Sequence, residues 1–373
     1  MNVQIEDSIE PLATEWELLA QQTKVSPFLR PGWFDAWWRA FGAGRLQILA
    51  VYESGRLAGV LPLRWFRGVL TSVTNTESTL FGLVAANNTA AKRLSDAVFS
   101  VKARHIGLDL LTPTDAGSSF IRAGAEAAHY HVLTKSIQSA PYVATTGSWD
   151  AYESGLRRKF RSELRRRRRR LLEEGKLSLD IYDGMEGLDA LLEEGFRIEG
   201  LGWKDAYRTS INSHLAARRF YTEVAQWAAE HGWLRLAFLR LNGRTLAFDY
   251  CLESNKTHYL LKTGFDPAYQ KYAPGMIIRH MMLARAFSEG ISRYDFLGIN
   301  DEWKREWASA QQERLFLHMF APTVPGLLDQ AAFTTREAIS QLGRTLIQSS
   351  VVSERSRRVL RRWYAMLRAR RLR

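Results

Sequence analysis

The sequence has little cysteine and no long apolar run, and each absence excludes a class of protein. Cys251 is the single cysteine in 373 residues, so the chain cannot form an internal disulfide and has too few thiols for a cysteine-based metal site. The apolar runs fall short of the roughly eighteen residues of a membrane-spanning helix. No grouping of His, Cys and Asp has metal-ligand spacing, and no Ser-His-Asp arrangement is evident. We therefore expect a protein that works without a metal.

The start of the chain has few basic residues. The segment from Met1 to Glu10 is acidic and contains no basic region followed by an apolar one, so no signal peptide is predicted. A cytoplasmic location is the expectation. The length suggests about two domains, and 46% hydrophobic and 12% aromatic residues are typical of a folded globular protein rather than a disordered one.

The net charge of +13 is confined to two segments. Leu156 to Arg170 carries ten basic residues and one acidic residue, and Val352 to Arg373 carries nine arginines and one glutamate. These segments contribute +9 and +8, so the rest of the chain is slightly acidic. The body of the protein therefore does not have the composition of a general nucleic-acid binder.

The first half predicts a helix, an aromatic helix and a β-hairpin. Trp33, Trp37, Trp38 and Phe41 recur at spacings of three and four, which indicates a helix whose aromatic face belongs to the core. The remaining predicted elements are a helix over Pro11 to Ala20, a hairpin over Leu46 to Tyr52 and Leu57 to Leu63, a strand over Ile106 to Leu111, a helix over Ser118 to Ala128, and a crossover over Pro141 to Ser148.

The second half predicts an α/β order that begins with one long helix from Ala151 to Gly175. Its six arginines, Arg165 to Arg170, surround an apolar stripe. The other predicted elements are strands over Leu177 to Tyr182 and Ser292 to Leu297, helices over Gly187 to Gly200 and Ala216 to His231, a hairpin over Leu234 to Arg240 and Thr245 to Glu253, and a strand over Leu315 to Phe320.

The most informative stretch predicts a strand, a turn and the start of a helix. Residues 257 to 263 have strand composition, and Gly264, Asp266 and Pro267 end the strand with turn chemistry. Pro274 then suits the first position of a helix that continues beyond Met276. Because a helix start presents free N–H groups and the positive end of a dipole, this turn is a candidate anion site. The pattern is also compatible with an ordinary turn of an α/β protein.

The order of these pieces resembles the acyltransferase domain of the GNAT superfamily. Within it the sequence is similar to the branch of CelD-type cellulose-biosynthesis proteins, which is related to the Fem-type peptidoglycan aminoacyltransferases. The matching segments are Leu164 to Gly175, Gly202-Trp203-Lys204, Gly264-Phe265-Asp266-Pro267, Tyr272-Ala273-Pro274-Gly275, and Tyr294 to Gly298 followed by Trp303-Lys304. The first half resembles the family in Ser26-Pro27, in the tryptophan helix and in Gly59 to Leu63.

Two departures from the family pattern bear on the expected cofactor. Trp303 stands where the family usually has tyrosine, and the glycine-rich pyrophosphate signature of the superfamily is not present in its usual form. The fold that the resemblance implies is a mixed α/β sheet in two tandem GNAT-like lobes. The expected divisions are a degenerate lobe over residues 1–148, an acyltransferase lobe over 149–321, and a basic helical tail over 322–373.

The resemblance implies that acetyl-CoA or another acyl-CoA lies where the fourth strand of the second lobe separates from its neighbour. By position this strand is His258 to Thr263, and the pyrophosphate would meet the helix that starts at Pro274. The expected cofactor-binding residues are Lys262, Gly264, Tyr272, Ala273, Pro274, Gly275 and Met276.

Direct acyl transfer requires a base that removes a proton from the acceptor. Glu199, beside the Gly-Trp-Lys turn, and Asp249, within an apolar strand, are the candidate bases. A helix-terminal salt bridge for Glu199 and an exposed strand position for Asp249 are the structural alternatives. The expected substrate-binding residues are Arg197, Trp203, Lys204 and Lys304. We expect Asp295 to hold a loop in place.

The two basic segments leave other functions open. In the tail, Val359, Leu360, Trp363, Met366 and Leu367 fall on one helical face, which suits an anionic membrane, an RNA or packing on the body. Arg165 to Arg170 suit either solvated ion pairs or an acidic partner such as tRNA. The alternatives to an acyl-CoA enzyme acting on an amine or hydroxyl, such as a sugar precursor, are therefore an aminoacyl-tRNA-dependent transferase and a nucleic-acid-binding protein.

Overall fold

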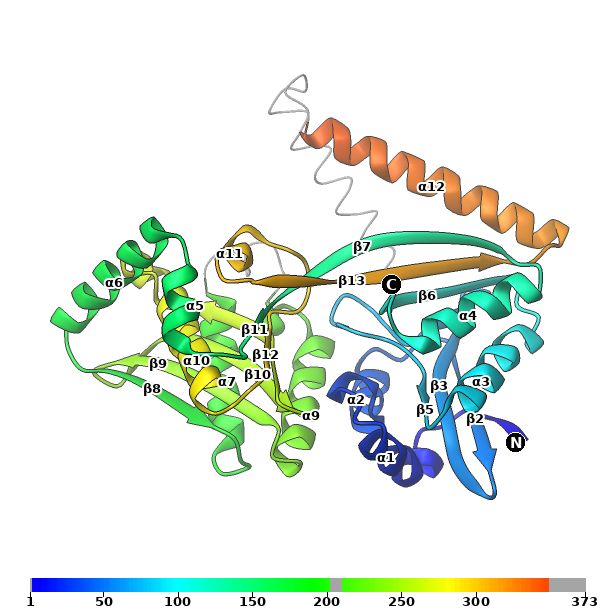
Figure 1. The fold of residues 1–373 in the computed structure, drawn as a ribbon, viewed down its shortest axis with the longest axis horizontal. Coiled ribbons are helices and arrows are strands. Elements are labelled where there is room, and N and C mark those ends of the chain that lie inside the picture. Colours follow the sequence, from blue (N-terminus) through cyan, green and yellow to red (C-terminus); the bar gives the residue numbers. More distant parts are fainter. Residues whose placement is uncertain (1, 202–209, 349–373) are drawn as a thin grey trace.

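The computed structural model describes residues 2–201 and 210–348, and these form two lobes joined by one continuous sheet (Figure 1). The elements of the first lobe are β1 (Asn2–Glu6), α1 (Ala13–Gln22), α2 (Pro31–Phe41), β2 (Arg45–Glu53), β3 (Arg56–Phe66), β4 (Val69–Ser72), β5 (Val84–Ala85), α3 (Asn88–Ser100), β6 (His105–Leu111), α4 (Ala116–Ala127) and β7 (His131–Ala144).

The second lobe repeats this order of strands and helices. Its elements are α5 (Trp149–Gly155), α6 (Arg158–Glu173), β8 (Leu177–Tyr182), α7 (Leu188–Gly200), η3 (Ile211–Ser213), α9 (Leu215–Glu230), β9 (Leu234–Leu241), β10 (Arg244–Ser254), β11 (Thr257–Phe265), η4 (Pro267–Tyr272), α10 (Pro274–Ser288), β12 (Arg293–Asp295), α11 (Glu302–Arg305) and β13 (Ala310–Phe320). A last helix, α12 (Val324–Gln348), follows.

The sheet has a nearly symmetrical strand order. It runs β1-β2-β3-β4-β6-β13-β7-β12-β11-β10-β9-β8, with β5 pairing β3 at the side. The two central strands are exchanged, because β7 continues from the first lobe to pair with β12, and β13 continues from the second lobe to pair with β6. Figure 1 shows β7 and β13 as two long antiparallel strands that bridge the lobes. The mixed α/β fold of tandem GNAT-like lobes is therefore confirmed.

Aromatic packing joins the first lobe to the second. Trp33 and Trp37 on α2 are buried, as the spacing predicts. The Trp33 ring lies 5.0 Å from that of Phe220 on α9, and Phe28 lies 5.0 Å from Tyr259 on β11, both edge to face. Since buried aromatic pairs contribute large apolar areas, the first lobe supports the strand around which the second is built.

Three sequence predictions differ from the structure. The helix predicted over Ala151 to Gly175 is two helices, because Leu156 and Arg157 have extended backbone (ψ 151° and 129°) next to the poor helix former Gly155. The segment 141–148 is predicted as a crossover, but its first four residues belong to β7, where Pro141 pairs with Gln311 of β13. The last strand starts at Ala310, five residues before the predicted Leu315.

Candidate active site

The pairing of β11 with its parallel neighbour β12 is very short. Only Thr257, His258 and Tyr259 pair, with Arg293, Tyr294 and Asp295. The rest of β11, from Leu260 to Phe265, pairs with β10 on its other side alone. Pairing between β11 and β12 therefore stops in the middle of the sheet, and β11 continues beyond it toward the turn before α10.

A carboxylate and an ammonium group fix the conformation of the loop after β12. Asp295 accepts a hydrogen bond from the Leu297 N–H at 2.9 Å, which confirms its predicted loop-holding position. The Lys304 Nζ, buried on α11, donates to the carbonyl oxygens of Leu297 and Ile299 at 2.9 and 3.0 Å. Burial lowers the pKa of Lys304. Lys304 thus supports the loop, and its ammonium group is already occupied.

The turn that leads into α10 matches the predicted stretch. Asp266 accepts a hydrogen bond from the Ala268 N–H at 2.9 Å and forms a 2.9 Å ion pair with Arg244. Ala273 adopts a left-handed backbone conformation (φ 51°, ψ 58°), and the N–H groups of Met276 and Ile277 donate to its carbonyl oxygen. The chain therefore turns sharply at Ala273, and α10 begins at Pro274 beside β11.

The N-terminus of α10 has the features of an anion site. Its first turn contains no acidic residue, and no side chain caps it. A small hollow of about 260 Å³ next to it is lined by Arg170, Glu173, Glu174, Lys271 and Tyr272. The Tyr272 hydroxyl donates to Glu174, which fixes the ring at the edge of this hollow. Two cationic and two acidic side chains thus line one small region near the positive end of the helix dipole, and Tyr272 binds one of the two acids, Glu174.

The corresponding helix of the first lobe is capped. The Asn87 side chain accepts a hydrogen bond from the Ala90 N–H at 2.9 Å, at the N-terminus of α3. The Asn87 side-chain oxygen therefore occupies the position that an anion would take at the N-terminus of α3. This difference between α3 and α10 favours the second lobe as the one that binds an anionic ligand.

Asp249, one predicted base, is paired with an arginine. It lies fully buried on β10, and its carboxylate oxygens are 2.8 and 2.9 Å from the guanidinium of Arg279 on α10. Arg279 also donates to the Tyr294 hydroxyl on β12 and to Thr263 on β11, the latter at 3.3 Å. Burial opposes the charge of Arg279, but Asp249 reverses the effect and raises the pKa of Arg279. Arg279 therefore links three strands beneath the opening.

Glu199, the other predicted base, lies at the C-terminal end of α7. It is 1% exposed, and its Oε2 accepts a hydrogen bond from the Ile211 N–H at 2.9 Å. The predicted Gly264 is its neighbour on β11, because a Cβ at Gly264 would overlap the backbone of Glu199 and lie 2.9 Å from the Ile198 carbonyl oxygen. The structure thus brings together Glu199 and the part of β11 that extends beyond its pairing with β12.

Lys262 points to the opposite side of the sheet from Arg279 and contacts the first lobe. Its Nζ lies 2.8 Å from Glu77, in the loop before β5, and 5.1 Å from the ring centroid of Tyr221 on α9. The Tyr221 hydroxyl donates to Glu77 at 2.9 Å. Burial alone would raise the pKa of Glu77. The charge of Lys262 and the hydrogen bonds from Lys262 and Tyr221 together have the larger effect, so the pKa of Glu77 is lowered. Lys262 therefore contacts Glu77 and Tyr221 rather than the start of α10.

One predicted substrate residue, Arg197, lies apart from this group. Arg197 is exposed on α7, where its charge acts on Glu194. Trp203 and Lys204 lie outside the described residues. The arginines of α6 face solvent for the most part, and four of them pair with carboxylates, as in the 2.5 and 2.6 Å contacts of Arg167 and Arg166 with Glu163.

Sequence reasoning did not select Arg279, Tyr221 or Glu77. The sequence does contain a pattern that could have identified Arg279. It is a charged residue within the apolar helical segment that starts at Met276, just as Asp249 is a charged residue within an apolar strand. Two opposite charges in two apolar segments predict a buried pair. No sequence pattern identifies Glu77, because its partner Lys262 follows 185 positions later, in the other lobe.

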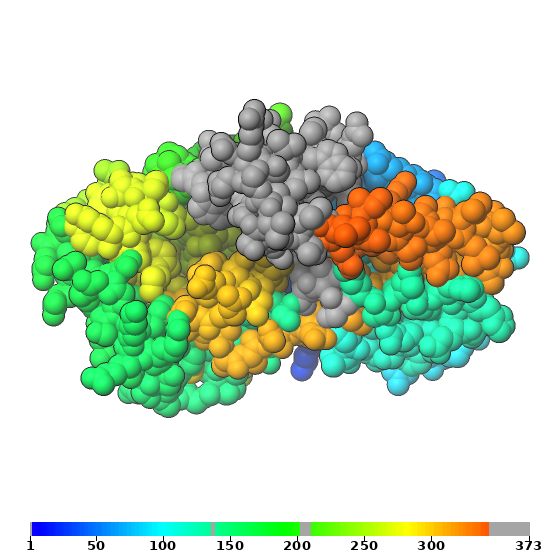
Figure 2. All heavy atoms as spheres, turned by 90° about the horizontal axis from the view of Figure 1, so that it is seen from above, coloured from blue at the N-terminus to red at the C-terminus, as the bar shows by residue number. Residues whose placement is uncertain are grey.

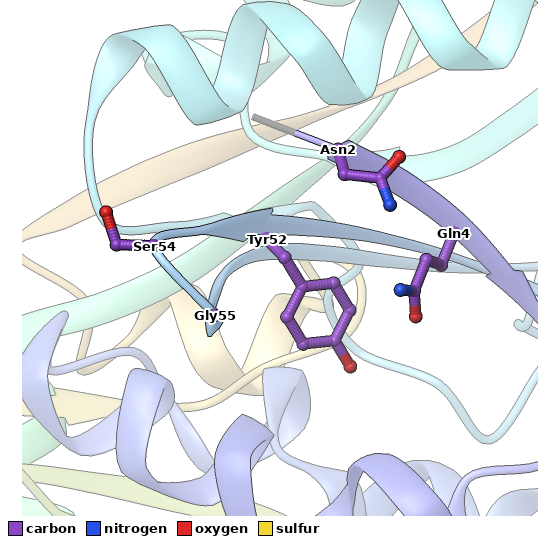
Figure 3. A pocket seen from close by; sticks show the side chains of 5 residues that line it. All are labelled: Asn2, Gln4, Tyr52, Ser54 and Gly55. Carbon is purple, nitrogen blue, oxygen red and sulfur yellow. The ribbon is translucent and has the colours of Figure 1, made fainter.

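The described residues contain no metal-binding cluster, and a second surface hollow has no charged lining. Within residues 2–201 and 210–348, no group of three or more His, Cys, Asp or Glu side chains is placed to hold a metal. The hollow in Figure 3, of about 500 Å³, lies at the outer edge of the first lobe between β1 and the β2–β3 turn. Its lining of Asn2, Gln4, Tyr52, Ser54 and Gly55 contains no charged group.

The fold and this opening define a protein with the GNAT architecture. Residues 158–305 match the family described as "Acetyltransferase (GNAT) domain". The match runs from the start of α6 to the end of α11, so it includes β11, the turn and α10. The region of similarity therefore lies within the second lobe.

Solved structures resemble most of the chain at low sequence identity. FemX has 14% identity and a TM-score of 0.56, over 85% of this chain and 97% of FemX. The C-terminal domain of a putative lysylphosphatidylglycerol synthetase from Agrobacterium fabrum has 11% identity and a TM-score of 0.53, over 87% and 96%. A protein of unknown function from Bacteroides thetaiotaomicron has 11% identity and a TM-score of 0.56, over 86% and 100%. These likenesses show the fold alone. No curated protein matches the sequence.

Proposed function

We propose that the second lobe transfers an acyl group from acyl-CoA to an amine or hydroxyl of an acceptor. The observation that carries the proposal is the early end of β11–β12 pairing beside the uncapped start of α10. The amide groups of the CoA arm would pair with β11 beyond its pairing with β12, as an added strand does. Its pyrophosphate would meet the N-terminus of α10 at Pro274, Gly275 and Met276, with Lys271 and Arg170 at the side.

Glu199 is the base that we propose, in preference to Asp249. Glu199 lies beside Gly264, on the part of β11 beyond its pairing with β12, whereas both oxygens of Asp249 face Arg279 in full burial. The acceptor would lose its proton to Glu199 and form a bond to the thioester carbonyl carbon. The carbon–sulfur bond then breaks, and the CoA thiolate takes up a proton. A backbone N–H of β11 would stabilise the oxyanion.

Asp249 and Arg279 have a positioning role in this proposal. Arg279 lies on α10 and contacts side chains of β10, β11 and β12. It therefore fixes the helix that would hold the pyrophosphate relative to the strand that would hold the acyl arm. Because reactions of bound groups depend on orientation, a small shift of α10 would reduce the rate.

The acceptor that we propose is a sugar or another cell-envelope precursor, from the resemblance to CelD-type and Fem-type proteins. A second donor, aminoacyl-tRNA, is favoured by one observation. Arg170, at the end of the exposed arginines of α6, lines the same hollow as Lys271 and Tyr272 beside α10. A phosphate backbone on α6 would then approach the start of α10 as the pyrophosphate of CoA would.

Thermal unfolding in the presence of each donor distinguishes acyl-CoA from aminoacyl-tRNA. Acetyl-CoA, longer acyl-CoAs and free CoA are added in turn, and aminoacyl-tRNA is added at two salt concentrations. We expect every CoA species to raise the unfolding temperature, because a ligand that binds only the folded state stabilises it. A shift with aminoacyl-tRNA alone, lost at high salt, would replace acyl-CoA as the donor.

A further inference from the structure

The last helix, α12, packs on the first lobe through its polar side. Asp329 forms a 2.8 Å ion pair with Arg104, and Glu337 forms a 2.6 Å ion pair with Lys135 on β7. Between them, Phe333 packs its ring 4.1 Å from that of His318 on β13. Both acidic side chains of the helix are therefore directed to the body of the protein.

The apolar side of α12 is consequently turned to solvent. Val324, Leu328 and Leu342 are 72%, 65% and 63% exposed, and Leu327 and Ile339 are about half exposed. Five of the twelve exposed large apolar side chains of the described residues thus lie on this one helix. Positions 324, 328, 331, 335, 339 and 342 follow one another at three or four residues, so they share one face. Figure 2 looks down on this side, where the orange spheres of α12 form a ridge along one edge of the molecule.

The charges around this ridge select the kind of partner. From Val324 to Leu342 the charged residues are Asp329, Arg336 and Glu337, and the two acids pair inward. Arg336 is the exposed one. The sequence that follows, Val352 to Arg373, has nine arginines and one glutamate. This face of α12 is thus an apolar stripe without exposed acidic residues, and a polybasic segment follows it in the sequence. Such a combination is complementary to a lipid surface, which has an apolar interior beneath anionic headgroups.

We propose that α12 lies flat on an anionic lipid surface, with its apolar ridge below the headgroups. None of the described helices is long and apolar enough to cross a membrane, so the contact is peripheral. A second copy of the chain is a weaker partner for this ridge, because each copy adds a segment of charge +8 next to the contact. The proposal does not depend on the acyl-transfer chemistry.

The experiment is co-sedimentation of the full-length protein with vesicles. One set contains phosphatidylcholine with phosphatidylglycerol, and the other contains phosphatidylcholine alone. The ridge variant is Leu328→Glu with Leu342→Glu. The control, Met185→Glu with Leu215→Glu, changes two other exposed apolar residues and adds the same charge. Unfolding temperatures confirm that both variants fold.

We expect the wild type and the control to sediment with anionic vesicles and to be released by salt. The ridge variant should partition on the order of a hundredfold more weakly, because two leucine side chains no longer enter the interface. Equal binding of the ridge variant would overturn the proposal and leave the arginine tail as the only contact. Absence of wild-type binding would also overturn it. A dimer in solution that the ridge variant dissociates, without vesicle binding, would assign the ridge to a second copy instead.

Discussion

Asp249 on β10 and Arg279 on α10 form an ion pair of 2.8 Å in full burial, beneath the point where β11 and β12 separate. Taking two charges out of water is costly, and their attraction offsets that cost only while both are present. The pair therefore fixes α10 to the sheet at the position where a donor would bind. We therefore propose Asp249 as a supporting residue rather than as the base.

Removal of one partner of this pair should destabilise the protein strongly. Arg279→Met leaves a buried, unpaired carboxylate, and we expect the free energy of unfolding to fall by about 3–5 kcal/mol. Arg279→Met combined with Asp249→Leu should restore most of that loss, because neither charge remains. Urea denaturation of the wild type, both single variants and the double variant measures the coupling. A loss below about 1 kcal/mol for Arg279→Met would mean that the pair is not a structural link.

Gly264→Ala should displace Glu199. The added Cβ would overlap the Glu199 backbone, and neither β11 nor α7 can move without disturbing the core. We expect a loss of about 1–3 kcal/mol in the free energy of unfolding, with a fall in transfer rate. Gly155→Ala is the matched control, because a Cβ there has no neighbour within 4 Å. Equal stability of Gly264→Ala and Gly155→Ala would show that the α7–β11 contact is looser than described.

Glu199→Gln should reduce turnover and preserve donor binding. The amide can still accept the hydrogen bond from the Ile211 N–H, but it cannot take a proton from the acceptor. The transfer rate should fall by about 10²–10⁴-fold, as is usual when a general base is removed. Release of CoA thiol measures the rate, and calorimetric titration measures donor affinity. A variant as active as the wild type would exclude Glu199 as the base.

Acid should weaken the fold through His105, which stacks on Phe320 and contacts His318 beneath α12. Burial lowers the pKa of His105 to about 4, with a further lowering by Arg104 that opposes the effect of Asp329. Between pH 6.5 and pH 4 the unfolded chain binds a proton that the folded chain does not. The free energy of unfolding should therefore decrease with falling pH in this window, by about 1–3 kcal/mol from this group.

His105→Phe tests this assignment, because phenylalanine keeps the ring contacts and cannot be protonated. Urea denaturation at several pH values should give the variant a shallower loss of stability between pH 6.5 and pH 4. All other titrating groups are common to both proteins, so the difference reports His105. Identical pH profiles would contradict the assignment.

The local elements of this fold follow from the sequence to a large extent, because they depend on neighbouring residues. The turn at Gly264 to Pro267, the helix start at Pro274 and the hairpin at Asn242-Gly243 all depend on local backbone chemistry. The exchange of β7 and β13 does not, because no local pattern tells a strand which sheet edge it will join. For the same reason the sequence selected Glu199 and Asp249 as charges in unusual positions but not their partners. Whether an isolated carboxylate is a base or half of an ion pair depends on the residue opposite.

The most direct test of the acyl-CoA site is calorimetric titration of acetyl-CoA into the wild type, Gly275→Ala and Gly275→Glu. A Cβ at Gly275 makes an ordinary contact with Phe265 at 3.4 Å, so both variants should fold. We expect the alanine variant to bind nearly as the wild type does. The glutamate variant should bind about tenfold or more weakly, because it places a negative charge where the pyrophosphate would lie. Equal affinity of all three proteins would place the donor elsewhere and contradict the account.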